Sequence, residues 1–143
     1  QKAFDLIQDV PLEKMNENQR GLVANNLAYM RVKTGGDPDA ALENIDTAFT
    51  LLGPRVELLD TRATINIKKG EFDRAIEDLK QATLFKVDSG VDYFHLALAY
   101  QGKGDRVAAA TALQQAEDLK FTGEIIDSMD REKYLKLKRW LRR

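Results

Sequence analysis

The chain lacks cysteine, has a single histidine and contains only three prolines in 143 residues. Without cysteine it can form no disulfide, no thiolate nucleophile and no cysteine-ligated zinc site. One histidine is too few for a multi-histidine metal centre. No apolar run approaches the roughly 20 residues that a membrane-spanning helix needs. We therefore expect neither a metal nor another cofactor, and no membrane partner.

The chain also lacks an excess of charge of either sign. The formal net charge is -1, with 31% charged and 43% hydrophobic residues, which is ordinary for a soluble globular domain. A nucleic-acid-binding domain usually carries a strong excess of basic residues, so we expect no nucleic acid partner. The chain starts without Met and shows no signal-peptide pattern, so we expect a segment of a longer protein or an already processed chain, and its compartment stays open.

What the sequence does contain is an internal repeat. The turn segments "KTGGDPDAA", "KKGEFDRAI" and "GKGDRVAAA" place Gly36, Gly70 and Gly104 at intervals of 34 residues. An alanine follows each glycine by five residues, an aliphatic residue follows that alanine by four, and a second alanine comes three later. These positions are Ala41, Ile45 and Ala48, then Ala75, Leu79 and Ala82, then Ala109, Leu113 and Ala116. Such spacing defines one face of a helix, with each glycine ending the helix before it.

A second helix-length stretch precedes each turn, roughly over Glu17–Lys33, Pro54–Lys69 and Gly90–Lys103. The helix–turn–helix unit of 34 residues resembles the tetratricopeptide repeat. The third copy carries the resemblance best, through Tyr93, Leu96, Ala97, Tyr100, Gly104, Ala109, Leu113 and Ala116. The middle copy departs from it, with Arg62 where leucine is usual and Asn66 where tyrosine is usual.

The resemblance implies an all-α fold, a right-handed superhelix of three helix pairs with a flanking helix at each end. We predict a single domain over 1–143, with an N-terminal flank at 1–20, repeats at 21–54, 55–89 and 90–123, and a capping helix at 124–143. In the flank, Ala3, Phe4 and Ile7 share one helical face. In the cap, an apolar stripe of Tyr134, Leu137 and Leu141 with Trp140 beside it would cover the last repeat.

In the family that the chain resembles, the first helices of successive repeats line a concave groove that takes an extended peptide or a helix of another protein. The resemblance thus implies a non-enzymatic protein-interaction module without a small-molecule substrate. Carried over by spacing, the groove residues are Asn25, Tyr29, Lys33, Glu57, Asp60, Thr64, Lys68, Val91, Phe94, Leu98 and Gln101. Tyr29, Asp60, Lys68 and Phe94 are the main candidates, with Tyr29 and Phe94 as apolar anchors. A lysine-rich clamp for a C-terminal carboxylate, found in chaperone-binding relatives, is not expected beside Glu57 and Asp60.

Two other roles remain open. The chain would also suit a structural segment of a longer solenoid that mediates assembly or self-association. The stretch from Asp130 onward has a net charge of +5 and would alternatively bind an anionic membrane, RNA or an acidic partner.

Single residues have competing interpretations as well. We expect His95 to be a partly exposed helix residue or a contact to a bound peptide. Arg62 is either a structural ion pair with Asp60 or Asp92, or a ligand-binding residue. The "GKG" at 102–104 is a turn, because a phosphate-binding loop would need Ser or Thr after the lysine and a strand before it.

Overall fold

The computed structural model describes residues 11–122 and 128–143, and every regular element within these ranges is helical. A short 3-10 helix, η1 (Leu12–Lys14), precedes seven α-helices. These are α2 (Glu17–Lys33), α3 (Pro38–Leu52), α4 (Val56–Lys69), α5 (Phe72–Phe85), α6 (Gly90–Lys103), α7 (Arg106–Asp118) and α8 (Ser128–Leu141). The all-α prediction is confirmed. The predicted helix carrying Ala3, Phe4 and Ile7 lies outside the described residues.

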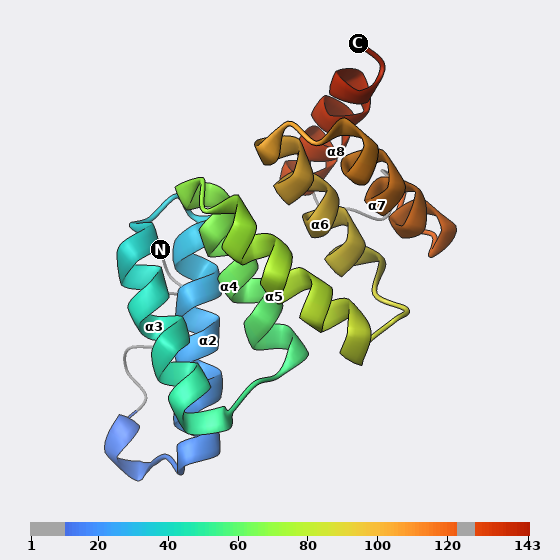
Figure 1. Cartoon of the computed structure of the whole chain (residues 1–143). Coiled ribbons are helices and arrows are strands. Elements are labelled where there is room, and N and C mark those ends of the chain that lie inside the picture. Colours follow the sequence, from blue (N-terminus) through green and yellow to red (C-terminus); the bar gives the residue numbers. More distant parts are fainter. Residues whose placement is uncertain (1–10, 123–127) are drawn as a thin grey trace.

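The helices pack in adjacent pairs, α2 with α3, α4 with α5 and α6 with α7, and the pairs follow one another along the molecule (Figure 1). The first helices α2, α4 and α6 also contact each other in that order, and α8 lies beyond the last pair (Figure 1). The chain is therefore a helical repeat, as its sequence period predicts. None of the described helices combines the length and apolar composition that crossing a bilayer requires.

The repeated small residues are the places where the paired helices meet. All six alanines of the repeat are fully buried, and so are the aliphatic residues between them, at 3% exposure or less. Small side chains at these contacts let helix axes approach closely, and a larger residue would force them apart. The periodic positions are Ala41, Ile45 and Ala48 in α3, Ala75, Leu79 and Ala82 in α5, and Ala109, Leu113 and Ala116 in α7.

Two hydrophobic clusters share the central helix α4. Leu58 and Ile65 belong to the cluster formed with α2 and α3, whereas Ala63 belongs to the cluster of α5, α6, α7 and α8. The capping helix contributes Tyr134 and Leu137 to the second cluster, with Trp140 and Leu141 packed against it. The apolar stripe predicted for the C-terminal helix therefore does cover the last repeat.

The turns follow the predicted chemistry with one correction. Gly70 and Gly104 end α4 and α6 in the left-handed conformation, with φ of 78° and 77°. In the first turn the left-handed residue is Gly35, with φ of 77°, and not Gly36. The reason is that α2 closes at Thr34, whose hydroxyl donates to the carbonyl of Met30, so the chain must turn one residue earlier.

A pair of substitutions at Gly104 tests the role of this turn. An added Cβ would meet no atom within 4 Å, so Gly104→Ala should cost only the strain of the left-handed backbone, about 1–2 kcal/mol in urea unfolding. Gly104→Asn should lose less, because asparagine enters this conformation more readily than alanine. Equal stability of Gly104→Ala and the wild type would contradict the assignment of a conformational role to this glycine.

Candidate functional site

One face of the first helices carries two cavities of about 380 Å³ each, which together we call the groove. The first, the apolar cavity, lies toward the C-terminal parts of the helices. It is lined by Val32, Lys33, Gly35, Thr64, Ile67, Lys68, His95, Leu98 and Lys133. The second, the acidic cavity, lies toward their N-terminal parts. It is lined by Asn25, Asn26, Tyr29, Val56, Glu57, Asp60, Thr61, Lys86, Ser89, Val91 and Asp92.

The structure brings most of the predicted groove residues to these cavities. Nine of the eleven line one or the other, namely Asn25, Tyr29, Lys33, Glu57, Asp60, Thr64, Lys68, Val91 and Leu98. Gln101 lies further along α6, is half-buried and lines neither cavity.

Phe94 is a correction to the predicted groove. Its side chain has no exposed surface, and its ring lies 5.0 Å from that of Phe121 and 6.2 Å from that of Tyr134, measured between centroids. The cause is the C-terminal part of the chain, which covers this side of α6. Phe94 therefore belongs to the core and is not available as an apolar anchor.

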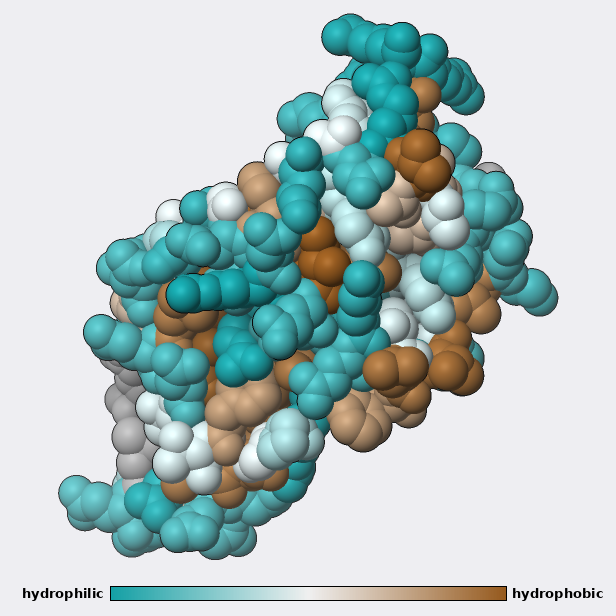
Figure 2. Space-filling view, viewed as in Figure 1, coloured by the Kyte–Doolittle hydropathy of each residue, from teal (hydrophilic) through white to brown (hydrophobic). Residues whose placement is uncertain are grey.

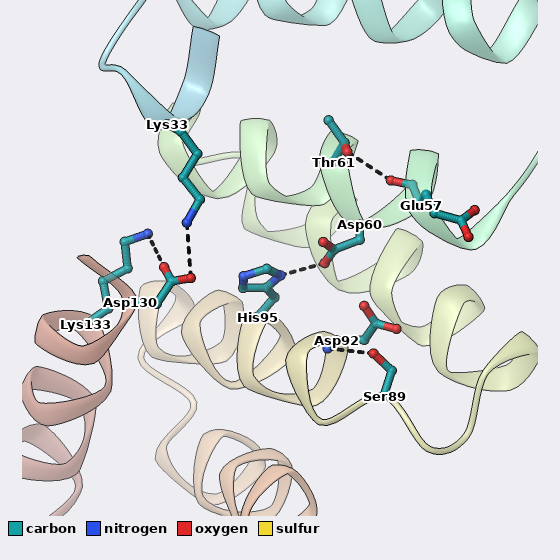
Figure 3. A network of polar contacts seen from close by, with 9 residues as sticks. All are labelled: Lys33, Glu57, Asp60, Thr61, Ser89, Asp92, His95, Asp130 and Lys133. Carbon is teal, nitrogen blue, oxygen red and sulfur yellow. Dashed lines mark hydrogen bonds and ion pairs between the residues drawn. The ribbon is translucent and has the colours of Figure 1, made fainter. Parts of the chain in front are cut away.

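His95 is a second correction, because it is buried and not partly exposed. It retains 8% exposure, and its Nδ1 lies 2.5 Å from Oδ1 of Asp60 on the neighbouring first helix (Figure 3). His95 lines the apolar cavity and Asp60 the acidic one, so their bond forms part of the boundary between the two. The two residues are 35 positions apart, close to the repeat period, and this spacing is the signal that could have predicted the pair.

The pair sets the protonation of the only histidine. Burial opposes the charged imidazolium, but the charge of Asp60 and its hydrogen bond outweigh burial and raise the pKa of His95 above 6.5. Asp130 adds to this effect from α8, while Lys133 opposes it. The charged histidine therefore stabilises the fold fully below pH 6.5, and this contribution is lost as the pH rises through the raised pKa.

A further ion pair joins the two ends of the described chain at the groove. Lys33 at the end of α2 lies 3.2 Å from Oδ2 of Asp130 at the start of α8, and Lys133 contacts the same carboxylate at 3.0 Å (Figure 3). Both lysines line the apolar cavity. The C-terminal helix therefore caps the last repeat and also forms one wall of the groove.

Arg62 forms a structural ion pair, but with a partner that the sequence did not indicate. It donates two hydrogen bonds to Asp78 of α5, at 2.8 and 2.7 Å, and its guanidinium lies 4.1 Å from the ring centroid of Phe49 on α3. Arg62 therefore ties three helices together, away from the groove. Neither Asp60 nor Asp92, the predicted partners, takes part in this contact.

The lysines of the basic C-terminal helix are engaged within the structure. Lys133 pairs with Asp130, Lys136 with Glu132 and Lys138 with Glu117. Charges paired in this way contribute less to attraction of a distant anionic surface than unpaired ones. The geometry thus gives these lysines a structural role.

Sequence reasoning missed an exposed apolar patch at the turn between α5 and α6. Leu84, Phe85 and Val87 are 81%, 66% and 70% exposed, and apolar side chains gather at this turn in the space-filling view (Figure 2). Leu84 and Phe85 end α5 away from its buried face, and Val87 follows the helix, so the repeat spacing gave no signal for this patch.

Across residues 11–122 and 128–143, no three His, Asp or Glu residues are placed to share a metal ion. In the same ranges, no hydroxyl is hydrogen-bonded to His95, as a nucleophile activated by it would be. Lys103 of the "GKG" turn pairs with Asp73 at 2.5 Å.

No protein-family model matches the chain, and no curated protein matches its sequence.

The single histidine allows a direct test of the Asp60–His95 pair. In the wild type, the His95 ring protons should titrate by NMR with a pKa above 6.5. In Asp60→Asn the carboxylate charge that outweighs burial is gone, so the pKa of His95 should fall below that of the wild type. Glu57→Gln, one helical turn away and without contact to His95, is the control and should leave the titration nearly unchanged. A histidine that titrates identically in wild type and Asp60→Asn would contradict the pair.

Proposed function

We propose that the chain is a tetratricopeptide-type interaction module that binds a segment of another protein in its groove, without catalysing a reaction. The 34-residue period, the helix pairs and the buried alanine positions agree with that family pattern. The partner would be an extended peptide or a single helix, since these are the shapes that a groove across parallel helices accommodates.

The observation that carries the proposal is that most of the expected groove residues line cavities on the same face of the first helices. Nine of the residues that the family resemblance implies for the groove line two adjoining cavities. Among them, Tyr29 and Val91 are large apolar side chains with 39% and 41% exposure, on different helices of the same cavity. Apolar anchors surrounded by polar residues are typical of binding hot spots.

Selection from a random peptide library displayed on phage, with the 143-residue chain immobilised, tests the proposal. Selected peptides should bind the wild type and lose about tenfold in affinity with Tyr29→Ala, because truncation of a central aromatic anchor costs more than about 1 kcal/mol. Affinity is measured by fluorescence anisotropy of labelled peptides.

Two valines provide a matched control. Val91→Ala in the acidic cavity should weaken the selected peptides, whereas Val107→Ala should not, although Val107 is 79% exposed on the second helix α7. Peptides that respond to Val107→Ala and ignore both groove substitutions would refute the groove as the binding surface.

A further inference from the structure

The acidic cavity contains two buried acceptor oxygens without partners. Asp92 is 4% exposed, and its Oδ2 has no hydrogen-bond partner among the residues that the structure describes. In that same part of the chain, Oδ1 of Asn25 on α2 is likewise buried and unpaired. Burying such an atom without a partner costs about 1–3 kcal/mol, so buried acceptors left open are exceptional in native proteins. Both residues line the acidic cavity, so two buried acceptors without a protein partner lie at its wall.

The charges around the cavity specify the kind of donor. Glu57, Asp60 and Asp92 line it, against Lys86 alone among lysines and arginines. Figure 3 shows Asp60 and Asp92 on facing helices with their carboxylates toward the same space. Asp60 already bonds His95, whereas Glu57 and Asp92 take part in no ion pair within the described ranges. A cationic donor therefore has the complementary charge.

The size and lining of the cavity favour an organic cation. Its volume of about 380 Å³ lies within the range of small-molecule sites, well above what one ion fills. The exposed ring of Tyr29 lines the same cavity and offers a face for a cation–π contact. An ammonium has three donors and a guanidinium five, so either group can donate to more than one of the acceptors that line this cavity.

The simpler explanation of Asp92 is that an acid in the first turn of α6 complements the helix dipole. The N–H of Asp92 does donate to the hydroxyl of Ser89, at 3.4 Å, which is a normal cap. However, burial, and then the charge of Asp60, raise the pKa of Asp92 above its ordinary value, and they outweigh the opposing effects of Ser89, His95 and Lys86. Its carboxylate is therefore less stable here than in water, whereas an acid that only complements the helix dipole can remain solvated.

We propose that the acidic cavity binds the side chain of a lysine or arginine from the partner segment, with Asp92, Glu57 and Asn25 as acceptors. This inference rests on the proposed groove function and specifies the chemistry of its ligand. Asp60 shapes the cavity through its bond to His95, while Tyr29 packs against the cation.

Four short peptides test the inference without knowledge of the natural partner. They are acetyl-Gly-X-Gly-amides with arginine, lysine, norleucine or glutamate at X, titrated into the isotope-labelled chain and followed by NMR. The arginine and lysine peptides should shift amide signals in the first half of α4 and the start of α6, and bind at least about tenfold tighter than the norleucine peptide. Norleucine keeps the aliphatic stem and removes only the charge.

Matched substitutions assign the effect to the cavity. Asp92→Asn and Glu57→Gln should each weaken the arginine peptide by about threefold or more, as loss of a charge-assisted hydrogen bond does. Glu43→Gln is the control, because Glu43 is an exposed acid of α3 whose carbonyl accepts from Thr47, just as that of Glu57 accepts from Thr61. Equal weakening by all three variants would indicate non-specific charge attraction and overturn the proposal.

Thermal unfolding separates binding from structure at Asp92. Asp92→Asn should unfold at the same temperature as the wild type or a higher one at pH 7, because it removes a destabilised buried carboxylate. A lower melting temperature together with unchanged peptide binding would make Asp92 a structural residue and refute the site.

The phage selection separates the two proposals. If the selected peptides bind through Tyr29 and Val91 without enrichment of lysine or arginine, the groove proposal is retained and the cation-site proposal is rejected. If no peptide binds the groove, both proposals fall.

Discussion

Close approach of paired helices through small residues is the constraint on which this fold depends. Ala41, Ala75 and Ala109 occupy equivalent positions in the three second helices, and none has exposed surface. A larger side chain at these buried positions would overpack the contact between paired helices, which typically costs about 1–3 kcal/mol. Because each second helix uses its small-residue face to hold a first helix, the opposite face of the first helices is left for the groove. The groove is thus a consequence of alanine placement 34 residues apart.

Polar contacts between elements distant in sequence then determine the detailed shape of that groove. Asp60 and His95 link two successive first helices, and Lys33 and Asp130 link the first helix to the last across 97 residues. Buried ion pairs often add no more stability to a core than apolar residues of similar size would. Their effect here is geometric, because they fix which helices face each other and divide the groove into an apolar and an acidic part.

The sequence predicted most of what local spacing controls and little of what depends on contacts between repeats. Helix positions and the buried alanines follow from one period, since residues that share a helical face share its environment. The nine groove residues that line the cavities came from the family resemblance, carried over with the same period. Phe94 could not be placed this way, because its burial depends on Phe121 and on the C-terminal helix, which are not repeats of earlier elements. Arg62 found its partner Asp78 in the second helix of its own pair, a contact for which the sequence offers many competing acids.

The distribution of charge along the groove has an ordinary physical origin that does not by itself imply a ligand. The first helices run parallel, with acids such as Glu57 and Asp92 in their first turns and lysines such as Lys33 and Lys68 in their last. This arrangement complements the helix dipoles and would arise without any partner. Dipole compensation works equally well for a solvated carboxylate, however, and gives no reason to bury one. The unpaired buried oxygen of Asp92 is therefore the feature on which the proposed cation site depends, since dipole compensation does not account for it.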